Sequence, residues 1–339
     1  MIRKIRLLEK KLNGNSAFDQ LGTLNQLARA YTFKDIEKTN TLAEEALHLA
    51  IDLNRSDEQA TAYYNIGVYH LYNNDFFSCA EAYKKAFSLS SSKNYLTLTR
   101  LNMSLGYVYS FTHNFEKALE YSNRALSIAE NNHLYEEVCS IYNNIARIHH
   151  NLEEYDIAVQ YFNEAIKISK EYNLTSLNAF FHMYAISNKM KLYSTDVEKS
   201  LLAIESHIEK KGELWFIGPV KILWAVYYIL NDTFDVAEIN YNIGYEILEE
   251  DHLLSYLLES CLDLTHALEY KNMNDEAEKI YLRTLTYLEE NKVILGLPKL
   301  YLAMSKFYSK KGQVALYQKY LRLYVKSKEE IENILSHYF

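Results

Sequence analysis

The amino-acid sequence predicts an all-α protein, a right-handed α-solenoid superhelix built from about eight helix pairs. Three observations support this prediction. Apolar residues recur at three- and four-residue spacing along the chain, as they do in helices with one buried side. The 339 residues include only two prolines and nine glycines, so little of the sequence is suited to β-turns. One residue pattern also recurs every 39 or 40 positions, which indicates a repeat protein.

The repeat is centred on a small residue near the end of the first helix of each copy. In the second copy Cys79, Tyr83 and Ala86 follow Gly67 by 12, 16 and 19 residues, and the next two copies keep these distances. The copy within residues 180–204 matches least well. The eight small residues are Ala28, Gly67, Gly106, Ala146, Ala185, Ala225, Thr265 and Ser305.

Each copy predicts two antiparallel helices joined by a short polar turn, such as "NNDF" or "THNF". The acidic or amide residue before the second helix can cap it. Two helices approach closely only where one side chain is nearly absent, so we expect the small residue at the crossing. A large aromatic side chain from the second helix then fills the remaining space.

This spacing resembles the tetratricopeptide repeat, whose pattern runs W-x2-L-G-x2-Y, then A-x3-F, then A. The stretches from Ile66-Gly67 to Ala86 and from Leu105-Gly106 to Ala118 carry the resemblance. The period exceeds the usual length of about 34 residues because the segments between repeats lengthen the flanking helices. Such long-period repeats are similar to the N-terminal sensory regions of bacterial diguanylate cyclases, histidine kinases and peptide-sensing regulators.

We divide the chain into three parts. Residues 1–16 form an N-terminal capping segment, residues 17–325 form the repeat array, and residues 326–339 extend the last helix. An apolar stripe that includes Ile331 and Leu335 continues beyond the normal end of the repeat. The extension therefore either caps the array or leads to an output domain or dimer partner absent from this chain.

The sequence contains no motif for a phosphate-binding loop, a zinc protease or a serine hydrolase. Its eleven histidines are scattered without carboxylates at ligand spacing, and acidic pairs such as Glu136-Glu137 read as solvated surface. We therefore expect neither an enzyme nor a metal or cofactor. Cys79, Cys139 and Cys261 predict free thiols and a cytoplasmic protein. A net charge of −8 and the lack of any 18-residue apolar run argue against nucleic-acid and membrane partners.

In tetratricopeptide arrays the first helices line the concave face, so the resemblance implies a peptide-binding groove there. Asparagine amides can pair with a peptide backbone, arginines can hold a carboxylate, and aromatic residues can form side-chain pockets. The predicted peptide-binding residues are Asn25, Arg29, Tyr64, Asn65, Arg100, Tyr107, Asn143, Asn144, Arg147 and His182.

Two of these residues, Asn65 and Arg100, fall where chaperone-binding members of the family place parts of a carboxylate clamp. Asn25, Arg29 and Ser104 depart from that clamp, so the resemblance does not extend to it.

The sequence thus predicts a non-enzymatic module that binds a peptide or protein segment, as the sensory or regulatory region of a bacterial signalling protein. Two alternatives remain open. One is a complete quorum-sensing-type peptide receptor, which normally carries an N-terminal helix-turn-helix or three-helix bundle, whereas here the first repeat begins near residue 17. The other is a scaffold for assembly of a protein complex.

Overall fold

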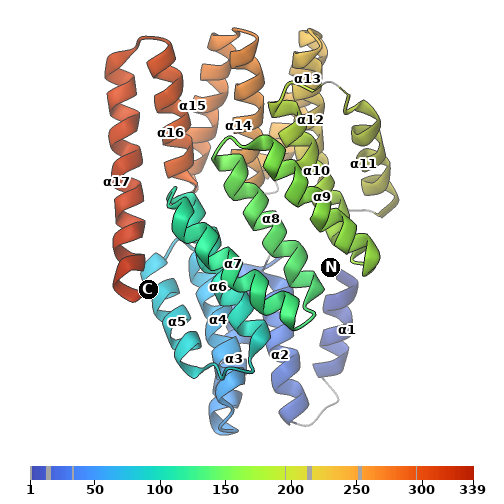
Figure 1. Ribbon diagram of the computed structural model, residues 1–339, viewed down its shortest axis with the longest axis vertical. Helices are drawn as coiled ribbons and strands as arrows, with labels where there is room; N and C mark the ends of the chain where they lie inside the picture. The colour runs from blue at the N-terminus through green and yellow to red at the C-terminus, as the bar shows by residue number, and fades with distance from the viewer. Residues whose placement is uncertain are drawn as a thin grey trace. The chain divides into compact units, whose positions relative to one another are not determined.

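The computed structural model describes residues 2–12, 17–32, 34–194, 196–211, 216–250, 254–294 and 296–339. Residues 13–16 of the expected capping segment lie outside these ranges. The described residues form α-helices and no β-strand (Figure 1). The helices are α1 (Ile2–Leu12), α2 (Ala17–Tyr31), α3 (Ile36–Asp52), α4 (Ser56–Tyr72), α5 (Phe76–Leu89), α6 (Tyr95–Phe111), α7 (Phe115–Asn131), α8 (Tyr135–Asn151), α9 (Tyr155–Glu171), α10 (Thr175–Lys191), α11 (Glu198–Lys211), α12 (Ile217–Leu230), α13 (Phe234–Glu250), α14 (Leu254–Tyr270), α15 (Asn274–Glu290), α16 (Leu297–Lys310) and α17 (Val314–Tyr338).

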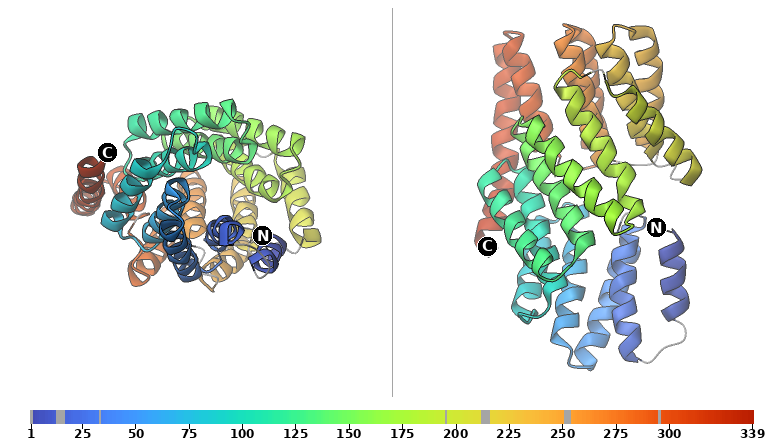
Figure 2. Two further views of the ribbon diagram at one scale, coloured as in Figure 1. Left: turned by 90° about the horizontal axis from the view of Figure 1, so that it is seen from below. Right: turned by 45° about the vertical axis from the view of Figure 1, so that its right-hand side comes forward.

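From α2 onward these helices form consecutive pairs, from α2 with α3 to α16 with α17. Both figures show each pair as two antiparallel helices joined by a short turn (Figures 1 and 2). The α-solenoid prediction is confirmed. The copy that matches the repeat pattern least well, within residues 180–204, also forms a helix pair, α10 with α11.

The predicted crossing residues are all buried, and those other than glycine range from 0% exposure at Ala28 to 5% at Ala185. Gly67 shows why a small residue is required. A Cβ atom built there would lie 2.4 Å from the ring of Tyr83 on α5, which is itself 1% exposed. The backbone of α4 therefore packs directly against an aromatic ring.

The turns within the pairs share one backbone geometry. Among the described residues, the turns within the seven pairs from α4–α5 to α16–α17 each hold one residue with positive φ, and at Asn74 the angle is 59°. The next N–H, that of Asp75, donates to the carbonyl of His70 at 2.9 Å, which closes a Schellman motif at the end of α4. Asp75 then caps α5 by accepting a bond from the Ser78 N–H at 3.0 Å, as predicted. The positive-φ residues of these turns are Asn74, His113, Glu153, Tyr193, Asp232, Asn272 and Gly312.

The chain divides into two compact units, which we describe separately. Unit 1 comprises Met1–Tyr109, Glu120–Glu137 and Glu329–Phe339. Unit 2 comprises Ser110–Leu119 and Val138–Lys328.

Within unit 1 the last part of α17 packs against α5. The ring centroids of Phe77 and Tyr338 lie 5.6 Å apart, and those of Phe87 and Phe339 lie 6.0 Å apart. The ammonium of Lys84 also lies 5.4 Å from the ring centroid of Tyr338. Two residues of the apolar stripe on α17, Ile331 and Leu335, are buried at 1% and 3% exposure.

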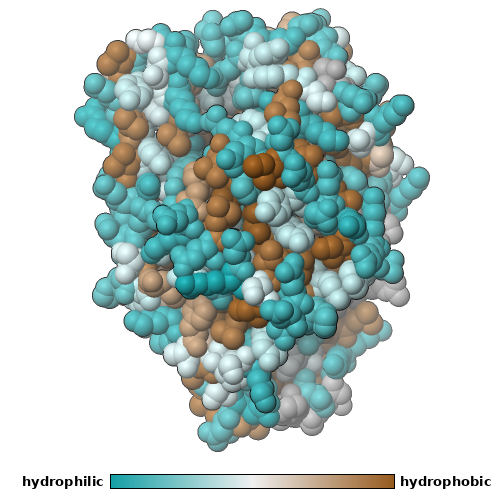
Figure 3. Space-filling view, in the orientation of Figure 1, coloured by the Kyte–Doolittle hydropathy of each residue, from teal (hydrophilic) through white to brown (hydrophobic). Residues whose placement is uncertain are grey.

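Apolar side chains are exposed in patches among hydrophilic ones on the face drawn in Figure 3. The most exposed of the large apolar side chains described are Leu7, Ile239 and Val314, which belong to three different helices. None of the described helices is long and apolar enough to cross a bilayer.

Candidate functional site

The first helices of the pairs carry the predicted site residues, and we call the surface that these helices form within each unit the first-helix surface of that unit. In unit 1 this surface comes from α2, α4, α6 up to Tyr109 and the first turn of α8. In unit 2 it comes from the rest of α8 with α10, α12, α14 and α16.

Two predicted amides join α2 to α4 in unit 1. The Nδ2 of Asn65 donates to both the backbone carbonyl and Oδ1 of Asn25, at 3.2 Å each. Asn25 in turn donates to the backbone carbonyl of Glu58 at 3.3 Å. Both asparagines are buried, so their amides link neighbouring repeats in this state.

Arg29 and Arg100, also predicted, converge on one carboxylate. Arg100 donates from Nε at 3.1 Å and from Nη2 at 2.8 Å to Oε1 of Glu137, and Arg29 Nη1 lies 3.4 Å from the same oxygen. Glu137 is 5% exposed, so the interpretation of this acidic residue as solvated surface is wrong. The carboxylate is buried because two guanidinium groups from other repeats surround it.

The two predicted tyrosines of unit 1 differ in exposure. Tyr64 is 6% exposed and stacks on Tyr83, with ring centroids 5.9 Å apart and an interplanar angle of 13°. It therefore belongs to the core between α4 and α5. Tyr107 on α6 is half-buried.

In unit 2 the predicted Arg147 also shares a carboxylate with a second cation. Its Nη2 donates to Oε1 of Glu259 at 3.1 Å, while Lys299 Nζ donates to Oε2 at 2.8 Å. Burial would raise the pKa of the Glu259 carboxyl, but the two cations outweigh burial and hold this pKa well below its usual range. The three side chains join α8, α14 and α16.

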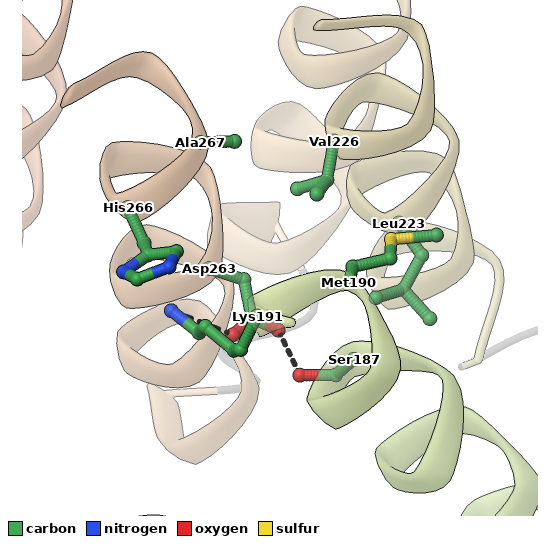
Figure 4. A pocket seen from close by; sticks show the side chains of 8 residues that line it. All are labelled: Ser187, Met190, Lys191, Leu223, Val226, Asp263, His266 and Ala267. Carbon is green, nitrogen blue, oxygen red and sulfur yellow. Dashed lines mark hydrogen bonds and ion pairs between the residues drawn. The ribbon is translucent and has the colours of Figure 1, made fainter. Parts of the chain in front are cut away.

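A second ion pair of unit 2 lies beside a small apolar cluster. Lys191 Nζ lies 3.2 Å from Oδ1 of Asp263, and Ser187 donates to Oδ2 of the same carboxylate at 2.6 Å. Figure 4 shows these side chains next to His266, with Met190, Leu223 and Val226 on the other side and Ala267 on the same helix as His266. Burial and the nearby Lys191 lower the pKa of His266 to about 4, so its imidazole is neutral at pH 7.

The remaining predicted residues of unit 2 are less exposed than an open groove implies. Asn143 is 8% exposed, and Asn144 is half-buried. His182 on α10 is also half-buried, and burial with nearby Lys170 lowers its pKa. One turn beyond Arg147, His150 Nδ1 lies 2.9 Å from Oδ1 of Asn188, and burial lowers the pKa of His150 to about 4.

These contacts provide no metal centre or reactive thiol. The described residues contain no group of three or more potential metal ligands. The three cysteines are free and buried, and burial raises the pKa of Cys261 to about 12 and that of Cys79 further. A neutral, enclosed thiol is a poor nucleophile.

Sequence reasoning missed the partners of the predicted cations. Glu137, Lys191, Glu259 and Lys299 were not among the predicted site residues. Arg147 and Glu259 are separated by 112 positions, so local spacing carries no signal for their pairing. One signal was available for Glu259. It precedes Asp263 by four residues and so lies on the same side of the predicted helix, which would have placed it on the first-helix surface.

Comparison with known proteins identifies the repeat. The Tetratricopeptide repeat family model matches residues 96–171. The recognition of tetratricopeptide repeats is therefore confirmed.

The chain is also similar to response regulator aspartate phosphatase I of Bacillus subtilis (strain 168). The two are 22% identical over 284 residues, which cover 80% of this chain and 68% of that protein.

Two solved structures share the fold over nearly their full length. One is a Rap protein complexed with competence and sporulation factor, with a TM-score of 0.64, 13% identity, and 98% of this chain and 99% of that chain covered. The other is the Rap conjugation gene regulator of plasmid pLS20 in complex with the Phr* peptide, with a TM-score of 0.58, 13% identity, and 94% and 97% covered. At such low identity these structures establish the fold alone. The expectation that this chain is not an enzyme stays a prediction, since the relative above is named a phosphatase.

Proposed function

We propose that this chain is a peptide-sensing regulator that binds an extended peptide on its first-helix surface. The observation that carries the proposal is the polar lining of this surface in both units. Amides and shared carboxylates, as at Asn65 and Glu137, join helices of different repeats there. The shared fold with a Phr*-bound regulator supports a peptide as the ligand.

Binding acts by exchange of hydrogen bonds. A peptide offers backbone amides to Asn25 and Asn65 and charged groups to the shared carboxylates. Each contact that it replaces joins helices of different repeats within one unit, such as Arg29 on α2 with Glu137 on α8. A ligand that prefers the opened contacts therefore shifts the arrangement of the repeats.

The likeness to the Rap protein covers nearly all of both chains, so we adopt the peptide-receptor alternative for this proposal. We also propose that residues 326–339 cap the array, a role supported by the packing of Tyr338 on Phe77. Removal of residues 329–339 should then lower the melting temperature, because it removes the ring contacts of Tyr338 with Phe77 and of Phe339 with Phe87. An unchanged melting temperature would argue for a segment that serves another partner.

A phosphorylated response regulator is the second candidate partner, because the named relative is a response regulator aspartate phosphatase. The test adds this protein to radiolabelled receiver domains phosphorylated on aspartate and follows loss of the label. A shortened lifetime of the phosphoryl group would establish this activity and overturn the prediction of a non-enzymatic module. Unchanged lifetimes with every receiver of the host would exclude it.

Peptide binding can be tested with a library of short random peptides passed over the immobilised full chain. Retained peptides are read by mass spectrometry and remeasured singly by calorimetry. Asn65→Ala and Arg147→Ala should weaken the binding of the retained peptides, whereas Glu246→Ala on α13, a second helix, serves as the control. Peptides that bind all three variants as tightly as the unmodified chain would place the ligand elsewhere.

A further inference from the structure

Arg29, Arg100 and Glu137 form a charge cluster with one carboxylate for two guanidinium groups. The three side chains come from α2, α6 and α8, and their contacts all converge on Oε1 of Glu137. The exposed fractions of the side chains are 29% for Arg29, 15% for Arg100 and 6% for Glu137. The cluster is thus largely withdrawn from water but remains open on the side of Arg29.

The cluster keeps one positive charge that no carboxylate in it balances. Arginine is charged at every physiological pH, so two guanidinium groups and one carboxylate leave a net charge of +1. Burial of unpaired charge is costly, which favours the recruitment of a second anion. Nη1 of Arg29 is buried and, among the described residues, has no hydrogen-bond acceptor of good geometry. The Nη1 group of Arg29 can therefore donate a further hydrogen bond to a bound anion.

The position of the cluster suits a peptide. Asn25 lies one turn before Arg29 on α2, so the linked amides of Asn25 and Asn65 share a side of the surface with the arginine. A chain segment that hydrogen-bonds to these amides can reach Arg29 with its next charged group. The guanidinium fork matches the two oxygens of a carboxylate.

We propose that Arg29 and Arg100 form a binding site for one carboxylate of the peptide ligand, with Glu137 as the built-in competitor for the same donors. This inference rests on the proposed peptide-binding function and names the chemistry of the ligand. The carboxylate is either an acidic side chain or the free C-terminus of the peptide. The site differs from the chaperone-type clamp because both cations are arginines and a carboxylate of the chain itself already contacts them.

Chemical rescue tests the site without knowledge of the peptide. In Glu137→Ala the two arginines lose their counter-ion, so sodium acetate should raise the melting temperature in a saturable way that sodium chloride at equal ionic strength does not reproduce. Glu137→Gln, which keeps the shape of the side chain, serves if the alanine variant does not fold. Further replacement of Arg29 by Met should abolish the acetate effect.

The matched control is Glu249→Ala. Arg283 there loses its carboxylate in the same way, so a second control, Glu120→Ala, removes the carboxylate of a solvent-exposed pair, the one with Arg124, and should show no selective response to acetate. Equal effects of acetate and chloride on both Glu137 variants would overturn the proposed site.

The peptide library separates the two sources of the carboxylate. It is prepared once with free C-termini and once with amidated C-termini, and retained sequences are compared between the unmodified chain and Arg29→Met. Enrichment of Asp and Glu in both libraries indicates a side-chain carboxylate, and retention only of free acids indicates the C-terminus. Whichever of these two enrichments the unmodified chain shows should fall at least tenfold in Arg29→Met.

The outcomes distinguish this inference from the proposed function. Peptides retained without any acidic group, and equally by Arg29→Met, would refute the carboxylate site while peptide binding stands. Rescue by acetate together with no retained peptide would refute the peptide function and leave an anion site.

Discussion

Replacement of Gly67 by alanine tests the packing on which every repeat depends. The new Cβ would lie 2.4 Å from Cδ1 and Cε1 of Tyr83, whereas ordinary contact begins at 3.4 Å, so the ring must move by about 1 Å. Tyr83 cannot move freely because it is 1% exposed and stacked on Tyr64. Overpacking of this kind costs about 1–3 kcal/mol, against a gain of about 1 kcal/mol in helix propensity. The difference is about 0–2 kcal/mol, so we expect a net loss of about 1 kcal/mol in the free energy of unfolding.

The assay is urea unfolding followed by circular dichroism and by tyrosine fluorescence, because an array of two units need not unfold in a single step. The matched control is Gly22→Ala in α2, where nothing lies within 4 Å of the added Cβ and the substitution should stabilise. Tyr83→Leu should relieve the clash, so Gly67→Ala and Tyr83→Leu should couple by about 1–2 kcal/mol. A Gly67→Ala variant as stable as the unmodified chain, or additive losses in the double variant, would refute the packing argument.

Three further predictions concern a turn, the buried histidines and the shared carboxylate of unit 2. Gly312→Ala should destabilise by about 1 kcal/mol in the same urea assay because φ is 68° at this position, although space around it is open. Acidification should unfold the protein, because burial lowers the pKa of His113, His150 and His266 to about 4, so the unfolded state binds more protons below pH 6.5. His150→Gln should flatten the fall in melting temperature between pH 7 and 4, whereas the exposed His48→Gln should leave the slope unchanged. Glu259→Ala should lower the free energy of unfolding by about 3–5 kcal/mol, because Arg147 and Lys299 lose their carboxylate. A triple variant with Arg147→Met, Glu259→Leu and Lys299→Met replaces all three charges by apolar side chains and should recover most of that loss.

The repeated fold could be predicted from the sequence because its determinants are local. The small residue, the aromatic ring and the turn of one pair lie within about twenty positions, as Gly67, Asn74 and Tyr83 show. Side chains there decide whether two neighbouring helices can touch. The same pattern at Ala225 and Ser305 gave the same buried crossing, even where other positions of the repeat had changed.

The candidate site could be predicted only in part. Helical periodicity placed Arg29, Arg100 and Arg147 on the first helices, but it could not show that carboxylates of distant repeats meet them. Tyr64 illustrates a second limit. It precedes Gly67 by three residues and so shares the side of α4 that meets α5, which buries its ring in the core. A residue near the edge of a helical face can lie in the groove or in the core, and only packing decides between them.

The shared carboxylates give the array a property that simple repeat stacking lacks. In a solenoid held only by neighbouring repeats, a local change spreads one interface at a time. Here Glu137 joins the first repeat to the fourth within unit 1, and Glu259 joins the fourth to the seventh and eighth within unit 2. An anion that displaces either carboxylate acts at once on helices several repeats apart. Because each carboxylate serves two cations, its loss leaves both uncompensated, so the opened state is costly unless the ligand supplies the missing charge. From the proposed carboxylate site we therefore expect this surface to favour an acidic ligand over a neutral one of equal size, and to couple binding to rearrangement through the same atoms.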